Sequence, residues 1–155
     1  MKFFVDPGLG KLAKWLRLAG FDTVPLRITP ETQLPLWQRG VYYLTKRGSW
    51  PPKKQRPDLI ILQGQEVEQQ LRELAQRLPL FSQTWQPLQR CSICNVKLRP
   101  LPADQVEGRV PDYVASRQPH FYECPQCQRV FWEGSQQRRI WQRLQDLCQT
   151  VNRKP

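Results

Sequence analysis

Four cysteines, arranged as two C-x-x-C pairs, constrain the fold of this chain more than any other feature of its sequence. The pairs are Cys91 with Cys94 and Cys124 with Cys127. A C-x-x-C turn places two thiolates where one tetrahedral zinc ion can bind both, and a second pair completes the site. Four thiolates leave no open coordination position, so the expected zinc is structural. The long interval between the pairs predicts a sizeable loop between two zinc knuckles.

Two other uses of paired cysteines compete with zinc: two disulfides in an exported protein, and a thioredoxin-type redox pair. A redox site would need one C-x-x-C after a strand, and this chain has two. Export has no support, because residues 1–5 are too short an apolar run for a signal peptide before Asp6 and Pro7. No apolar run approaches the roughly 20 residues that span a bilayer. We therefore expect a cytoplasmic protein with no membrane partner.

The charge of the chain predicts a polyanionic partner. The 155 residues carry a net charge of +11, and the excess is spread along the chain. Residues 1–88 contain 13 Lys and Arg against 7 Asp and Glu, and residues 89–155 contain 11 against 6. Nucleic acid is the commonest partner of such a protein. In some basic proteins, however, the net charge only keeps the protein soluble. We expect two domains, 1–88 and 89–155, with the cysteines in the second.

Residue patterns in the first 88 residues predict a small parallel α/β sheet, because strand and helix signals alternate. Strands are expected over residues 2–6, 41–45 and 59–63, and helices from the Gly10 turn to about Ala19 and from about Glu66 to Leu78. Segment 28–39 is ambiguous: residues 29–31 are typical of a helix start, but Pro35 would shorten or kink that helix. A last helix is expected after residues 134–135.

Asp6 is the first candidate site residue, because function gathers at the carboxyl ends of parallel strands. A carboxylate there can hold a divalent cation, and it can equally cap the following helix. Lys11, Lys14 and Arg17 share the polar arc of that helix and can receive a phosphate backbone. The lone His120 excludes sites built on two histidines.

Several runs of residues together resemble a known family. The longest is 4–17, Phe-Val-Asp-Pro-Gly-Leu-Gly-Lys-Leu-Ala-Lys-Trp-Leu-Arg. The others are Gly-Phe-Asp at 20–22, Tyr-Leu-Thr at 43–45, Glu-Gln-Gln-Leu-Arg at 68–72, Arg-Cys-x-x-Cys-Asn at 90–95, Val-Pro at 110–111, Phe-Tyr-x-Cys-Pro-x-Cys at 121–127 and Trp-x-Gly-Ser at 132–135. The chain resembles, over nearly its whole length, the PIN-like RNase domain family named after the C-terminal region of the Mut-seven exonuclease.

The resemblance implies a small PIN-like parallel sheet flanked by helices, followed by a zinc-ribbon module and a C-terminal helix. It also implies RNA as the substrate and several carboxylates that hold Mg²⁺ or Mn²⁺ for cleavage. Asp6 matches the first acid, and Glu31 falls near the second. The third belongs to a Thr-Arg-Asp sequence, where this chain has Thr45, Lys46 and Arg47. The family's Gly-Ser-His-Trp is likewise Gly-Ser-Gln-Gln at 134–137.

Arg47 decides between the functions that the resemblance implies, because it removes a metal ligand and repels a divalent ion. Asp58 is not expected to replace the missing carboxylate, because it precedes the third expected strand and should lie at the opposite edge of the sheet. The favoured function is an RNA-binding protein with weakened or lost nuclease activity. The alternatives are an active Mg²⁺- or Mn²⁺-dependent ribonuclease using Asp6 and Glu31, and a protein-interaction adaptor built on the zinc ribbon. The expected RNA-binding residues are Lys11, Lys14, Arg17, Lys46 and Arg47.

Overall fold

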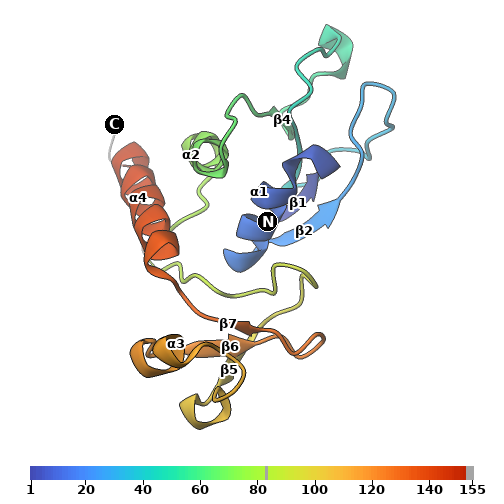
Figure 1. Cartoon of the computed structure of the whole chain (residues 1–155). Helices are drawn as coiled ribbons and strands as arrows, with labels where there is room; N and C mark the ends of the chain where they lie inside the picture. Colours follow the sequence, from blue (N-terminus) through green and yellow to red (C-terminus); the bar gives the residue numbers. More distant parts are fainter. Residues whose placement is uncertain (83, 153–155) are drawn as a thin grey trace.

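The computed structural model describes residues 1–82 and 84–152, with side chains up to residue 150 (Figure 1). The first part of the chain alternates strands and helices. Its elements are β1 (Lys2–Val5), a 3₁₀ turn (Pro7–Leu9), α1 (Gly10–Leu18), β2 (Asp22–Pro25), β3 (Val41–Thr45), a second 3₁₀ turn (Pro52–Lys54), β4 (Leu59–Ile61) and α2 (Val67–Arg77). The three strands and two helices predicted from the sequence are therefore present.

The four strands form one parallel sheet in the order β2-β1-β3-β4. The predicted parallel α/β sheet is confirmed, and β1 lies at its centre with Val5 opposite both Pro25 and Leu44. Strand β2 was not predicted. It has only four residues, and its two β-branched residues stand between Asp22 and Pro25, which belong to residue types that are depleted in strands.

The two faces of the sheet are covered differently. Phe3 and Val5 point into the main core, which they share with apolar side chains of α1 and α2. Phe4 points to the other face, where a smaller cluster forms around Ile28, Tyr43, Trp50 and Leu59. That cluster is made by the sheet and its connecting loops, so helices cover one face and loops the other.

Segment 28–39, which the sequence left ambiguous, does not form a helix. A turn forms there instead, with the Thr32 N–H bonded to the Thr29 carbonyl at 3.0 Å. The Thr32 hydroxyl in turn accepts a hydrogen bond from the Thr29 N–H at 3.0 Å. Threonine side chains that bond nearby backbone groups compete with helix formation. These hydrogen bonds between Thr29 and Thr32, together with Pro35 three residues later, prevent a helix from forming here.

The second part of the chain is a small antiparallel sheet with the four cysteines at its turns. Its elements are β5 (Arg99–Leu101), a 3₁₀ turn (Ala103–Gln105), α3 (Asp112–Arg117), β6 (Phe121–Glu123), β7 (Val130–Phe131) and α4 (Ser135–Asn152). The strand order is β5-β6-β7, and β6 is the central strand. The expected ribbon module and C-terminal helix are both present. Among the described residues, no helix combines the length and apolar character needed to cross a membrane.

Helix α4 leaves the small sheet and packs beside α2, as Figure 1 shows. Its Ile140, Trp141, Leu144 and Cys148 are buried in the same core as β1, α1 and α2. The Trp141 ring lies 4.7 Å from the ring of Trp15, centroid to centroid. The main core thus contains side chains from both sides of the expected domain boundary at residue 88. The division into 1–88 and 89–155 as folding units stays a prediction.

Candidate functional site

Asp6 lies at the position of the parallel sheet where ligands usually bind. It directly follows β1, and the chain runs from β1 to β2 on one side and returns to β3 on the other. The carboxyl ends of β1 and β3 therefore border a topological switch point, where the loops diverge and leave a crevice. The Asp6 N–H bonds the Leu44 carbonyl at 3.0 Å, which fixes the residue between these two strands.

The Asp6 carboxylate is nearly buried and contacts Thr45, the last residue of β3, and Arg47 in the loop that follows. Its side chain is 10% exposed, and its Oδ2 lies 3.2 Å from Arg47 Nε. The Thr45 hydroxyl donates to the same oxygen at 3.2 Å. Asp6 stands at the N-cap of the 3₁₀ turn but makes no side-chain capping bond. The carboxylate therefore pairs with a guanidinium and does not cap the helix, which was the alternative left open by the sequence.

Arg47 is held in this position by its own loop. Its N–H donates to the Thr45 hydroxyl at 3.1 Å, and its carbonyl accepts the indole N–H of Trp50 at 2.6 Å. Trp50 is buried in the loop-side cluster of the sheet, so it anchors the turn that carries Arg47. The guanidinium occupies the side of Asp6 where the family resemblance places a third acid.

A pocket of about 490 Å³ opens beside this ion pair. It is lined by Asp6, Pro7, Gly8, Leu9, Arg27, Lys46 and Arg47. Three of these side chains are cations and one is an acid, so the pocket is positively charged. Arg27 was missed by the sequence reasoning because it follows β2, the strand that was not predicted. The signal that would place it is its position just after the carboxyl end of a strand.

Glu31 lies outside this lining, in the exposed turn after β2. A hydrogen bond from the Thr29 side chain is the main cause that holds the pKa of Glu31 below its usual range, with smaller contributions from the charges of Lys54 and Arg47. Among the described residues, one group of three or more His, Cys, Asp or Glu side chains is close enough to share a metal ion, and it consists of cysteines. Asp6 and Glu31 belong to no such group.

The three basic residues of α1 lie outside the pocket lining. Lys11 and Lys14 are exposed on the helix surface. The Arg17 guanidinium donates to the Thr23 carbonyl at 3.0 and 2.9 Å and to the Ser92 carbonyl at 3.0 Å. Arg17 therefore joins α1 to two distant segments. The expected role of these residues in RNA binding stays a prediction.

The four predicted zinc ligands converge. The sulfur atoms of Cys91, Cys94, Cys124 and Cys127 all lie within 4.8 Å of one another. Cys91 Sγ and Cys127 Sγ are 3.8 Å apart, close to the edge of a tetrahedron with zinc–sulfur bonds of about 2.3 Å. All five cysteines are free thiols in this structure, so the disulfide alternative gains no support. The cluster is consistent with a zinc ribbon, and Cys148 packs separately in the main core.

Backbone N–H groups lie close to sulfur atoms of the cluster. The N–H groups of Ile93 and Cys94 point at Cys91 Sγ, at 3.5 and 3.3 Å. The backbone N–H of Arg129 is the main cause that lowers the pKa of the Cys127 thiol to about 6. Burial raises the pKa of the Cys91 thiol. A bound zinc ion would supply the positive charge that lets all four sulfurs ionise together, and it would hold the two knuckles in place.

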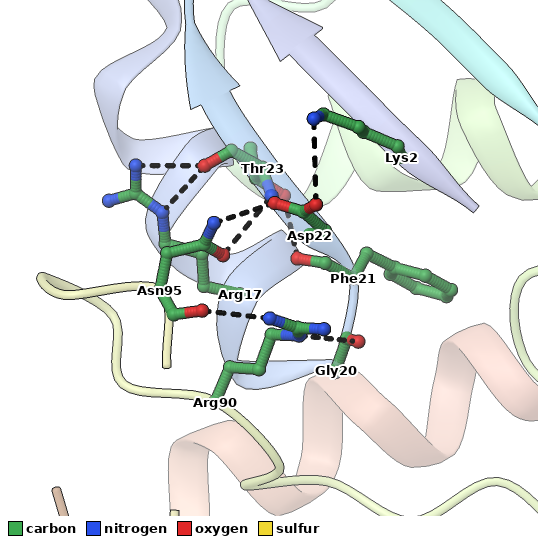
Figure 2. Close-up of polar contacts among 8 residues, drawn as sticks. All are labelled: Lys2, Arg17, Gly20, Phe21, Asp22, Thr23, Arg90 and Asn95. Carbon is green, nitrogen blue, oxygen red and sulfur yellow. Dashed lines mark hydrogen bonds and ion pairs between the residues drawn. The ribbon is translucent and has the colours of Figure 1, made fainter. Parts of the chain in front are cut away.

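The first knuckle docks on the outer edge of β2 (Figure 2). Asn95, the residue after Cys94, accepts the Thr23 N–H on its Oδ1 at 3.1 Å and donates from Nδ2 to Asp22 Oδ1 at 2.7 Å. Because Arg17 binds the Thr23 carbonyl, both outward backbone groups of Thr23 have partners. Lys2 completes the arrangement with an ion pair to Asp22 at 3.7 Å.

A second set of contacts fixes the knuckle to the end of α1. Arg90 donates from Nε to the Gly20 carbonyl at 3.1 Å and from Nη1 to the Asn95 carbonyl at 2.8 Å (Figure 2). Gly20 has a φ of 98°, and a β-carbon there would lie 2.5 Å from Gln89 Oε1. Only glycine combines this conformation with so close a neighbour. The motif residues Gly20, Asp22, Arg90 and Asn95 therefore act together as an interface between the two sheets.

Comparison with known proteins agrees with this architecture. The protein-family model described as Mut7-C RNAse domain matches residues 1–144. Searches of curated proteins and of solved structures returned no significant match. The family match includes the parallel sheet, the Asp6 pocket, the four cysteines and the start of α4. The chain therefore belongs to the Mut7-C RNase domain family.

Proposed function

We propose that this protein binds RNA and that its metal-dependent nuclease activity is weakened or lost. One observation carries the proposal: Arg47 Nε lies 3.2 Å from Asp6 Oδ2, on the acid that the family resemblance makes the metal anchor. Divalent hard cations bind several oxygen ligands. Arg47 stands where the family has a carboxylate, so one oxygen ligand is missing, and its guanidinium beside Asp6 repels a divalent ion. As a donor set, one ion-paired acid with Arg27 and Lys46 close by suits an anion better than Mg²⁺ or Mn²⁺.

The positive charge of the chain supports RNA as the partner. The net charge is +11, and the RNase family of the chain points to the same polyanion. In this proposal Lys46 and Arg47 contact RNA at the pocket, and Lys11, Lys14 and Arg17 of α1 supply further contacts. Affinity that depends on such contacts falls with rising salt, by a logarithmic slope of about 0.7 per phosphate contact on single strands.

An active ribonuclease that uses Asp6 and Glu31 is the second candidate. The observation in its favour is that, besides the Thr29 hydrogen bond, the charge of Arg47, the partner of Asp6, helps to hold the pKa of Glu31 below its usual range. A rotation of the half-exposed Arg47 side chain would free the Asp6 carboxylate, and Glu31 would then have to approach it to share a metal ion.

Cleavage assays on a labelled single-stranded RNA separate the two candidates. With Mn²⁺ we expect little or no cleavage by the wild type. Arg47→Asp should raise Mn²⁺-dependent cleavage, because it restores an oxygen ligand and removes the competing cation. Adding Asp6→Asn to that variant should abolish the gain.

Lys46→Asp is the matched control, since it makes the same change of charge one residue away and Lys46 donates to Gln65, not to Asp6. A gain in Arg47→Asp alone therefore reports ligand geometry rather than net charge. Brisk Mn²⁺-dependent cleavage by the wild type that disappears in Asp6→Asn would show the second candidate to be correct.

A further inference from the structure

Positively charged side chains outnumber negatively charged ones in the pocket lining. Asp6 is the only acid in the lining, and Arg47 already pairs with it. Arg27 forms no ion pair within the described part of the chain, and Lys46 donates to the neutral side chain of Gln65 at 2.9 Å. Two positive charges therefore face the pocket without a counter-charge from the protein.

Arg47 itself keeps donors for a ligand. Only its Nε donates to Asp6, and the hydrogen bonds within residues 1–82 and 84–152 leave both terminal nitrogens of its guanidinium unused. The side chain is 49% exposed, so these nitrogens can be reached from solvent. A guanidinium presents parallel N–H groups that match the oxygens of a phosphate.

The backbone at Gly8, which is part of the pocket lining, is also open to a ligand. A β-carbon on Gly8 would have no atom within 4 Å, so the turn over Pro7–Leu9 is open above this residue. The turn leads into α1, whose first residues receive no side-chain cap. The partial positive charge of the helix start adds to that of the three cations.

We propose that this pocket binds a terminal phosphate group of RNA. The inference rests on the proposed RNA binding and goes beyond it by naming the part of the RNA that enters the pocket. A phosphate monoester carries a charge of about −1.5 to −2 at pH 7, whereas each internal phosphodiester carries about −1. Two unmatched cations complement the monoester better. The volume of about 490 Å³ is in the range of small-ligand pockets and leaves space for the group and part of its nucleotide.

Binding to three forms of one short single-stranded RNA tests the proposal. The forms carry a 5′-phosphate, a 3′-phosphate or no terminal phosphate, and the fluorescent label is attached at an internal base. Anisotropy is measured with zinc-loaded protein and without added Mg²⁺ or Mn²⁺. We expect one phosphorylated form to bind about tenfold more tightly than the unphosphorylated one, the effect of one extra charge-assisted contact. The two phosphorylated forms show which end is bound.

Arg27→Ala should reduce this preference to less than about twofold, while the affinity for unphosphorylated RNA falls far less. Lys46→Ala provides a second variant should Arg27→Ala fail to fold. Arg117→Ala is the matched control, because Arg117 is an exposed arginine on α3 outside the pocket lining. It should leave the preference unchanged.

Three results would overturn the proposal in distinguishable ways. Equal, salt-dependent affinity for all three RNAs refutes the terminal-phosphate site and leaves the proposed RNA binding standing. A preference that persists in both Arg27→Ala and Lys46→Ala places the phosphate elsewhere on the protein. No binding to any of the RNAs at low salt refutes RNA binding itself.

Discussion

Two residues occupy equivalent places in the two zinc knuckles but have different neighbours. Asn95 follows Cys94 and Gln128 follows Cys127, and both adopt a positive φ, 63° and 61°. Asn95 makes two side-chain hydrogen bonds to β2, whereas the Gln128 side chain donates to Pro125 within its own knuckle. The first knuckle is thereby adapted for contact with the parallel sheet, and the second is not.

The comparison of Asn95→Ala with Gln128→Ala measures the energy of this contact together with the preference of asparagine for a positive φ. Both substitutions put an alanine at a positive φ, where asparagine is tolerated better than glutamine. Asn95→Ala also leaves the Thr23 N–H without its partner, and we expect it to lower the free energy of unfolding by about 1–2 kcal/mol more than Gln128→Ala. Thermal or urea unfolding of the zinc-loaded proteins measures the difference. Equal destabilisation would mean that the contact adds no stability.

At the scale of the elements, α4 joins the end of the chain to its beginning. Trp141 is 2% exposed and packs against Trp15, Phe81 and Trp85, with ring centroids 4.7, 5.8 and 5.0 Å away. These rings come from α1 and from the segment that precedes the ribbon. In the sequence, the ribbon therefore lies between two parts of the chain that pack into one core.

Trp141→Ala should destabilise the whole protein by about 3–5 kcal/mol, because it removes a large buried side chain from that core. Trp37→Ala is the control, since Trp37 is 60% exposed in the loop before β3 and its loss should change stability by no more than about 0.5 kcal/mol. Denaturant unfolding with both variants measures the contrast. Similar small effects would show that α4 is only loosely attached.

Sequence patterns predicted most of these elements, and the exceptions have physical causes. The 3.6-residue periodicity of α1 and α2 and the apolar residues of β1, β3 and β4 are local signals, so they could be recognised directly. Strand β2 depends on its partners more than on its residues, since Thr23 is bonded by Asn95 and Arg17. Missing β2 also concealed Arg27 in the pocket. Distances such as that between Arg47 and Asp6 depend on strand order, which no local pattern contains.

At the scale of the whole molecule, the ribbon and the parallel sheet are coupled through their shared interface. The first knuckle bonds β2 and the end of α1, and Gln89 N–H donates to the Leu18 carbonyl at 3.0 Å. A zinc ion that orders the knuckle would also order these contacts. Removal of the metal should therefore also weaken the part of the parallel sheet that the knuckle contacts.

Hydrogen exchange before and after chelation of zinc tests this coupling. We expect residues 89–134 to lose protection before the parallel sheet does, because the ribbon depends on its metal for stability. The Thr23 amide should follow the ribbon, since its partner is Asn95, whereas the Asp6 amide between β1 and β3 should stay protected. Protection of Thr23 that survives chelation would contradict the coupling.

The docking of Asn95 and Arg17 on Thr23 has a consequence for association between molecules. A sheet edge with free N–H and C=O groups is a template on which a strand of another molecule can pair. Asn95 of the knuckle and Arg17 of α1 cover that template at Thr23 with side chains, which cannot extend the sheet any further. Loss of zinc would release Asn95 and uncover the Thr23 N–H, so we expect the metal-free protein to form β-rich aggregates through β2. The zinc ribbon would then prevent copies of this protein from associating through the edge of the sheet.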